Sequence, residues 1–312
     1  MPKRLISVVI PAYNEEACLP ELASRLAQLM DTNDHFTWEV IVIENGSDDF
    51  SWPILVDICS ADSRFRAIQL SRNFRADGGI TAGLRHASGD ACVIMMADLQ
   101  DPVDLIPQLI EKWEEGFENV YGLVSRRGGT GPIRRMNSRF FYWLASKLTG
   151  QRVTPNASDF RLVDRKVYQA VLSLNESNRF VRGLFSWVGF SSIGVPFERE
   201  ARFGGVSKAH TLKVLQLAIH AILAHTVLPL RLITVMGFVS AFVALAVLGW
   251  SAYLFVLEGV PFDGFGTIVG INVLGFSFLT LALGVIGEYL GLVHEESKDR
   301  PHFIVRDSIG FD

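Results

Sequence analysis

Two long stretches without charge constrain this chain more than any other feature. Leu232–Leu257 spans 26 residues and Gly264–Gly287 spans 24, and neither contains Asp, Glu, Lys or Arg. Each exceeds the roughly 20 apolar residues that a helix needs to cross a bilayer. The first two thirds of the chain, in contrast, carry charges throughout, although 49% of all 312 residues are hydrophobic. We therefore expect a water-exposed domain followed by two transmembrane helices.

The charges beside these stretches predict their orientation. Arg231 precedes the first, and Lys298, Arg300 and Arg306 follow the second, whereas the connection 258–263 has no Lys or Arg. By the positive-inside rule, the flanks are cytoplasmic and the connection lies outside. The amino terminus leads straight into a strand-like run and shows no signal-peptide cleavage site. We expect a multi-pass protein of the inner (cytoplasmic) membrane, with the charged domain and both termini in the cytoplasm.

In the charged domain, short apolar runs alternate with helical patterns. Asn14 is expected to cap a first helix, with Glu15 and Glu16 near the positive end of its dipole. Strands that alternate with helices predict βαβ units and an α/β fold with a mostly parallel, doubly wound sheet. The strand-like runs are Leu5–Ile10, Trp38–Ile43, Phe65–Leu70 and the run that begins at Cys92.

Polar side chains follow each of these strands. Because the carboxyl ends of parallel strands share one edge of a sheet, the side chains there form a nucleotide-sized site. The sequence lacks both a G-x-G-x-x-G after the first strand and a Walker motif, which disfavours a Rossmann dinucleotide site and a P-loop. The edge residues are Pro11, Tyr13, Glu15, Glu44, Asn45, Arg72, Asn73, Asp77 and Asp98.

The run that begins at Cys92 ends in two carboxylates and an amide, Asp98, Gln100 and Asp101. Oxygen ligands at a strand tip suit a divalent cation and a phosphorylated ligand. An isolated D-x-x-D is more often a turn than a ligand site. The prediction of a site therefore depends on the several polar residues that follow neighbouring strands at one edge of the sheet.

A basic region follows this site. Between Val124 and Ala170 there are ten Lys or Arg residues and two Asp residues. Such a region favours phosphate groups or anionic lipid as partners over a merely solvated face. Nucleic acid is disfavoured, because no recognised nucleic-acid module accompanies it.

An ordered series of motifs along nearly the whole chain resembles the family 2 glycosyltransferases. The resemblance is strongest to the polyprenyl-phosphate hexosyltransferase type, which includes dolichyl-phosphate mannose synthase and bacterial undecaprenyl-phosphate glucosyltransferases. The motifs are V-V-I-P-A-Y-N-E-E from Val8, V-I-V-I-E-N-G-S-D-D from Val40, L-S-R-N-F from Leu70, A-D-L-Q-D-P from Ala97, D-F-R-L from Asp159, R-F-V-R-G from Arg179, R-F-G-G-V-S-K from Arg202 and G-E-Y-L-G from Gly287.

The resemblance implies a GT-A fold and an inverting transfer of a hexose, with UDP-glucose the first expectation, to polyprenyl (undecaprenyl) phosphate. Asp98 and Gln100 would hold Mg²⁺ or Mn²⁺ on the diphosphate, and Asp98, Asp101 and Lys208 would be catalytic. Met96 stands where the family has the first Asp of D-x-D. The donor nucleotide would contact Pro11, Tyr13, Glu15, Glu44, Asn45, Arg72 and Asp77, and the acceptor phosphate would contact Arg126, Arg127, Arg134 and Ser138.

An acceptor phosphate is already ionised near pH 7, so Asp101 is expected to position the sugar or metal, with a general-base role as the alternative. The expected regions are a GT-A domain (1–208), a juxtamembrane amphipathic helix region (209–230), two transmembrane helices (231–290) and a cytoplasmic tail (291–312). Small residues in the second span, such as Gly270 and Gly275, suggest a homo-oligomer. The alternatives are a non-catalytic sugar-nucleotide-binding membrane protein or lipid-sugar translocation helper, and a processive polysaccharide synthase.

Overall fold

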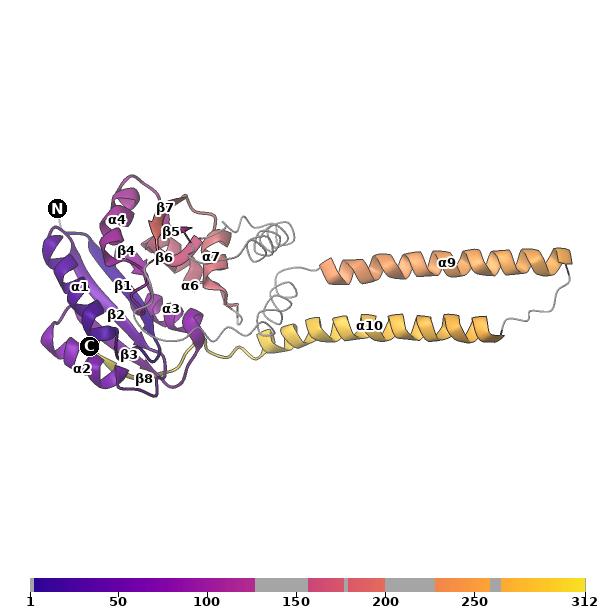
Figure 1. The fold of residues 1–312 in the computed structure, drawn as a ribbon, viewed down its shortest axis with the longest axis horizontal. Helices are drawn as coiled ribbons and strands as arrows, with labels where there is room; N and C mark the ends of the chain where they lie inside the picture. Colours follow the sequence, from indigo (N-terminus) through magenta and orange to yellow (C-terminus); the bar gives the residue numbers. More distant parts are fainter. Residues whose placement is uncertain (1–2, 127–156, 177–178, 200–227, 259–264, 312) are drawn as a thin grey trace. The chain divides into compact units, whose positions relative to one another are not determined.

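The computed structural model describes residues 3–126, 157–176, 179–199, 228–258 and 265–311. They belong to two units (Figure 1). One is an α/β domain that extends to residue 199 and includes residues 299–311, and the other contains the long helices α9 (Leu228–Glu258) and α10 (Phe265–Ser297). The chain therefore returns to the α/β domain after α10.

The domain is built on an eight-stranded sheet of order β7-β5-β6-β4-β1-β2-β3-β8. Strands β1 to β4 are mutually parallel, while β6 and β8 run antiparallel to their neighbours. This confirms the predicted α/β fold, and the strand order reverses between β1 and β4, where such sheets bind ligands. The strands are β1 (Leu5–Ala12), β2 (Thr37–Glu44), β3 (Phe65–Leu70), β4 (Ala91–Ile94), β5 (Asn119–Arg126), β6 (Ala157–Asp164), β7 (Ser192–Glu198) and β8 (Val305–Ile309).

Helices cover both faces of the sheet. One face packs against α1 (Leu19–Thr32), α2 (Ser51–Ala61), the short 3₁₀ helix η1 (Val103–Leu105) and α4 (Ile106–Glu114). The other packs against α3 (Arg75–His86), α6 (Arg165–Leu172) and α7 (Val181–Trp187). Burial on both faces explains why the central strands are continuous apolar runs rather than alternating ones.

The predicted start of the first helix at Asn14 is wrong. Helix α1 begins at Leu19, with Cys18 at the N-cap position. Asn14 instead adopts a left-handed φ of 55°. Its backbone N–H donates to Ser47 Oγ at 3.0 Å, and its side-chain oxygen accepts from the N–H of Asp48 at 2.9 Å. A tertiary contact between two loops therefore uses the side chain that local sequence assigns to a cap.

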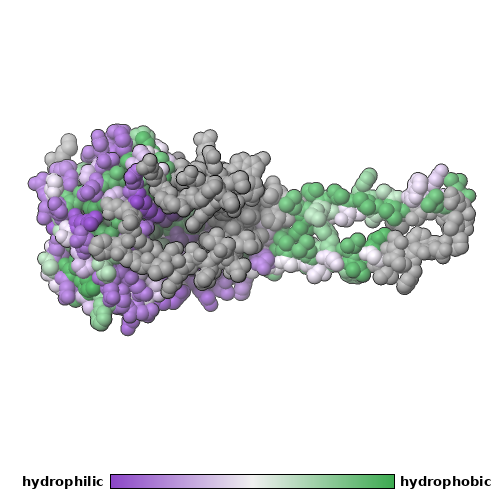
Figure 2. Space-filling model, viewed as in Figure 1, coloured by the Kyte–Doolittle hydropathy of each residue, from purple (hydrophilic) through white to green (hydrophobic). Residues whose placement is uncertain are grey.

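Helices α9 and α10 contain segments long and apolar enough to cross a membrane, Leu232–Leu254 and Gly270–Ser297. The most apolar parts of these segments are 0% and 6% buried, so neither helix packs as a core helix of a water-soluble domain does. Figure 2 shows the hydrophobic surface that both helices present.

Candidate active site

The loops that follow β1, β2 and β3 are held together at the carboxyl edge of the sheet. Asn45 donates from Nδ2 to the carbonyl of Arg75 at 2.8 Å and accepts from the N–H of Phe74 at 2.9 Å. Its own N–H bonds to the carbonyl of Ala12 at 2.9 Å. A Cβ on Gly46 would lie 2.4 Å from the carbonyl carbon of Arg72, so only glycine permits this approach. Asn45 thus shapes the edge through its protein contacts.

Backbone strain marks the same edge. Four non-glycine residues in the described ranges have a left-handed φ, and three of them, Asn14, Arg75 and Leu99, follow strands β1, β3 and β4. Leu99 is the most unusual, because a bulky buried side chain rarely adopts this conformation. Residues held in such conformations gather at ligand and catalytic sites.

Glu44, the last residue of β2, is fully buried. One oxygen, Oε1, accepts from the N–H of Ser47. The other, Oε2, has no hydrogen-bond partner among the described residues. A buried carboxylate oxygen without a donor is costly, so Glu44 is suited to accept a hydrogen bond from a ligand.

The other predicted donor residues lie around Glu44 with different exposure. Pro11 is buried in β1, Tyr13 is exposed, and Glu15 is half-buried. Arg72 is exposed, and its guanidinium lies 4.0 Å from the ring centroid of Phe74. The site therefore combines a buried polar group with side chains that can reach a ligand from solvent.

Asp98 and Asp101 lie in the loop that follows β4. Asp98 is half-buried, and its Oδ1 accepts from the N–H of Gln100 at 3.2 Å. Asp101 is buried, accepts from the N–H of Met96 at 3.2 Å and pairs with Arg199 Nη2 at 3.4 Å. Burial raises the pKa of Asp101, and the charge of Arg199 opposes that rise. Asp101 is thus fixed by the protein, and sequence reasoning missed its partner Arg199.

A second carboxylate and arginine pair lies on the α7 side of the sheet. Arg182 donates from Nε to Asp159 Oδ1 at 2.7 Å and from Nη2 to Oδ2. Burial raises the pKa of Asp159, but the bonds and charge of Arg182 outweigh it and hold this pKa below its usual value. Asp77 Oδ1 accepts from the N–H of Val181 at 2.9 Å, and burial raises the pKa of Asp77.

Sequence reasoning assigned no role to Asp159, Arg161 or Arg182. Arg161 is buried, with its guanidinium 4.8 Å from the ring centroid of Phe185, and burial lowers its pKa to about 10. The signal was present, since all three belong to the motifs D-F-R-L and R-F-V-R-G that carry the family resemblance.

Much of the predicted acceptor site lies outside the described residues. Arg127, Arg134 and Ser138 are not described, and of Arg126 only the backbone, at the end of β5, is described. The predicted catalytic residue Lys208 also lies outside the described residues. Their roles stay predictions.

The oxygen atoms near β4 fit a hard divalent cation. Among the described residues, no three His, Cys, Asp or Glu side chains gather as a metal cage. Mg²⁺ commonly binds through one or two carboxylates together with substrate phosphates and water. Asp98 and Gln100 therefore fit a metal whose coordination a diphosphate completes.

Comparison with known proteins gives consistent matches. The family model described as glycosyl transferase family 2 matches residues 7–172. An uncharacterized glycosyltransferase, sll0501 of Synechocystis, is 38% identical over 98% of this chain and 96% of its own length. The bactoprenol glucosyl transferase of Shigella phage SfV is 34% identical over 97% of this chain and 98% of its own. Among solved structures, glucosyl-3-phosphoglycerate synthase from Mycobacterium tuberculosis gives a TM-score of 0.46 at 20% identity, covering 70% of this chain and 78% of that chain.

Proposed function

Because the chain belongs to glycosyl transferase family 2, we propose that it is an inverting, metal-dependent enzyme that transfers a hexose to polyprenyl phosphate. The preferred donor is UDP-glucose and the preferred acceptor is undecaprenyl phosphate, giving a polyprenyl-phosphate hexose for cell-surface glycans. Relatives named as bactoprenol glucosyl transferases, aligned over almost their whole length, support glucose as the sugar and a bactoprenol lipid as the acceptor.

The proposal depends most on Glu44 Oε2, which has no hydrogen-bond partner among the described residues and lies at the same sheet edge as Asp98. Strands β2 and β4 flank β1, so their tips lie about 10 Å apart at the usual strand spacing. A nucleoside diphosphate spans such a distance. Glu44 would accept a hydrogen bond from the base or ribose while the diphosphate reaches Asp98 and Gln100.

The chemistry is a single displacement. An ionised oxygen of the acceptor phosphate forms a bond to the anomeric carbon as the bond from that carbon to the departing diphosphate breaks, which inverts its configuration. A divalent cation, when bound by Asp98 and Gln100, neutralises charge on the leaving group. Asp101 positions the sugar or metal, because the acceptor needs no proton removed. The basic region with Arg126, Arg127, Arg134 and Ser138 would hold the acceptor phosphate.

The lipid acceptor gives α9 and α10 a role as membrane spans. Strand β8 lies in the same sheet as β1, so the sequences before α9 and after α10 belong to one domain. This supports two spans with both flanks on one side, which the positive flanking charges make the cytoplasm. Gly270 and Gly275 of α10 would allow close helix packing in a homo-oligomer.

An assay of membranes that contain the full chain tests the proposal. Labelled UDP-glucose, other UDP-hexoses and GDP-mannose are offered with undecaprenyl phosphate and Mg²⁺ or Mn²⁺, and membranes without the protein are the control. A metal-dependent, acid-labile glycolipid with one sugar supports the proposal. A polymer would indicate a processive synthase, and no product with any donor would indicate a non-catalytic binding or translocation role.

A further inference from the structure

The C-terminal residues form the edge of the sheet beside the donor site. Strand β8 pairs antiparallel with β3, with Gln69 opposite Asp307. Just before β8, the carbonyl of Ile304 accepts from the N–H of Ser71 at 2.9 Å. Ser71 begins the loop that leads from β3 into α3. The segment that arrives from α10 therefore bonds directly to the loop that carries Arg72.

The same segment contacts both ends of α3. At the first turn, a Cβ on Gly78 would lie 3.2 Å from the carbonyl oxygen of His302, so the backbone of the tail passes close to the helix. At the last turn, the ring of His86 lies 6.2 Å from that of Phe303 and 5.4 Å from that of Phe311. Two aromatic side chains of the tail thus pack where α3 ends.

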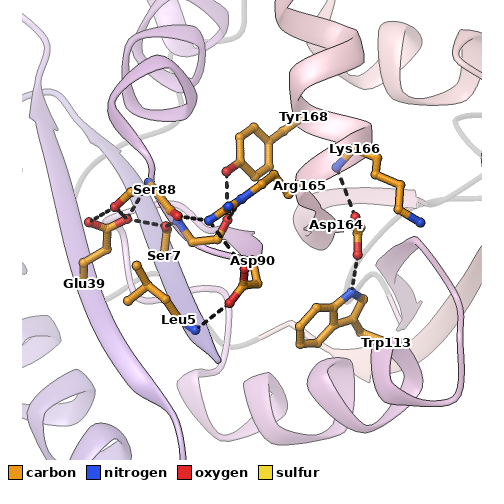
Figure 3. Close-up of polar contacts among 11 residues, drawn as sticks. Leu5, Ser7, Glu39, Ser88, Asp90, Trp113, Asp164, Arg165, Lys166 and Tyr168 are labelled. Atoms are coloured by element: carbon orange, nitrogen blue, oxygen red, sulfur yellow. Dashed lines mark hydrogen bonds and ion pairs between the residues drawn. The ribbon is translucent and has the colours of Figure 1, made fainter. Parts of the chain in front are cut away.

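A polar chain extends this contact to the turn after α3. The guanidinium of Arg66 lies 5.6 Å from the ring centroid of Phe311 and donates to Glu39 Oε2 at 3.2 Å. Glu39 also accepts from the N–H of Ser88 at 2.7 Å, a contact drawn in Figure 3. Phe311, near the end of the tail, is therefore connected through the side chains of Arg66 and Glu39 to Ser88, which lies just after the end of α3.

The packing of the tail is concentrated on these aromatics. Val305, Arg306, Asp307 and Ser308 of β8 are exposed, whereas Phe303 and Phe311 pack against the core cluster that contains α3. Strand β8 itself therefore contributes little to the core, and the tail packs mainly through Phe303 and Phe311 at α3.

Helix α3 in turn forms one wall of the donor site. A Cβ on Gly79 would lie 2.9 Å from Pro11 Cβ, so the helix lies against the tip of β1. Asn45 binds the backbone at its start, and Asp77 bonds to Val181 of α7. A shift of α3 would therefore move several groups at the carboxyl edge together.

We propose that the tail from His302 to Phe311 is a clamp that positions α3, and the loop before it, for binding of the nucleotide sugar. Phe303 and Phe311 are positioning residues, since their rings lie against His86 at the end of α3 and would act on the donor through that helix. The inference rests on the proposed function for its ligand. It makes the segment that follows the second apolar helix part of the frame of the donor site.

The test compares Phe303→Ala with Leu26→Ala in the full chain. Leu26 is a fully buried residue of α1 on the opposite face of the sheet, so its variant controls for a general loss of stability. Phe303→Ala should raise the KM for the donor about tenfold, leave the KM for the lipid acceptor unchanged, and speed hydrogen exchange in residues 71–79. Phe303→Tyr, which keeps the ring, should restore the donor KM.

Equal donor KM and equal exchange at 71–79 in the two alanine variants would overturn the clamp. The exchange measurement needs no substrate, so it decides the positioning of α3 even for an inactive protein. A wild-type chain that makes no product with any donor contradicts the proposed function instead, which separates the two failures.

Discussion

Two buried glutamates of β2 show how the two ends of the sheet differ. Glu39 and Glu44 are 4% and 0% exposed. Glu39 accepts hydrogen bonds from Ser7 Oγ, from the N–H and Oγ of Ser88, and from Arg66. Glu44 accepts one from Ser47 and keeps an oxygen without a partner among the described residues. Both glutamates are buried, but Glu39 is bonded within the protein, whereas Glu44 can still accept a hydrogen bond from a ligand.

The network around Glu39 continues into a closely packed turn (Figure 3). The N–H of Gly89 donates to Ser7 Oγ at 2.8 Å, and its carbonyl accepts from Arg165 Nε at 3.0 Å and from the hydroxyl of Tyr168 at 2.8 Å. A fully satisfied network of this kind rigidifies a fold. We infer that substitutions here change stability, whereas substitutions at the carboxyl edge change turnover.

The largest expected effect is at Asp98. Asp98→Asn keeps an acceptor for the N–H of Gln100 but removes the charge that would hold the metal. We expect kcat/KM to fall about 10³-fold, roughly 4 kcal/mol of transition-state stabilisation, with an unchanged melting temperature. Steady-state assays and thermal unfolding of the full chain measure both. If the variant kept half of the wild-type activity, the proposed metal site at Asp98 would be wrong.

Gly89→Ala should produce the opposite result. A Cβ there would lie 2.5 Å from Ser7 Oγ and 2.6 Å from the carbonyl oxygen of Ala91, and the latter is backbone that cannot move cheaply. We expect a loss of about 3 kcal/mol in the free energy of unfolding. Turnover per folded molecule should stay near that of the wild type. Gly116→Ala, where a Cβ would meet nothing within 4 Å, controls for glycine loss in a turn. Gly116 has a left-handed φ of 103° and Gly89 does not, so a larger loss of stability in Gly89→Ala than in Gly116→Ala would come from the clash and not from the backbone conformation.

The sequence was sufficient for the features that depend on local apolar pattern. Strands predicted at Leu5–Ile10, Trp38–Ile43 and Phe65–Leu70 match β1, β2 and β3 to within two residues at either end. Strands β1 and β2 are buried along almost their whole length, so their mostly apolar runs are visible in the sequence, whereas β3 is recognisable although it includes the half-buried Arg66 and Gln69. The family and the fold class followed from the motifs at the tips of these strands.

Features that depend on distant pairing were not visible. Strand β8, V-R-D-S-I, is mostly exposed and has no apolar run, and its partner β3 lies far earlier in the chain. The pairs Arg199–Asp101 and Arg182–Asp159 join residues that lie far apart in the sequence. Nothing in the local sequence around either arginine indicates its partner, whereas the fold brings both pairs together.

A matched pair of substitutions on β2 tests the comparison directly. Glu44→Gln should raise the donor KM about 20-fold, near 1.8 kcal/mol, because an amide group would face the ligand where an acceptor is needed. Its melting temperature should not fall. Glu39→Gln should instead lower stability, because its amide must face Ser88 or Arg66, and should raise the donor KM far less than Glu44→Gln does. If both variants changed stability and donor KM to the same extent, the proposed difference between the Glu39 end and the Glu44 end of the sheet would be wrong.

The smallest effect is expected at Arg182. Its substitution tests whether this residue, although it lies near the site, contributes to stability. Arg182 lowers the pKa of Asp159, so this pair stabilises the folded state above the usual aspartate pKa of 3.8 and loses that contribution as pH falls through the lower folded value. Arg182→Met should therefore cost about 1 kcal/mol at pH 7, since both side chains are about 30% exposed. Its melting temperature should approach that of the wild type below about pH 4. Thermal unfolding from pH 7.5 to about pH 2, below the lowered pKa of Asp159, measures this convergence, with Arg182→Lys, which keeps the charge, as the control. A difference in melting temperature that stays constant with pH would show that Arg182 stabilises α7 by packing. The Arg182–Asp159 ion pair would then count neither as a stabilising contact nor as part of the site.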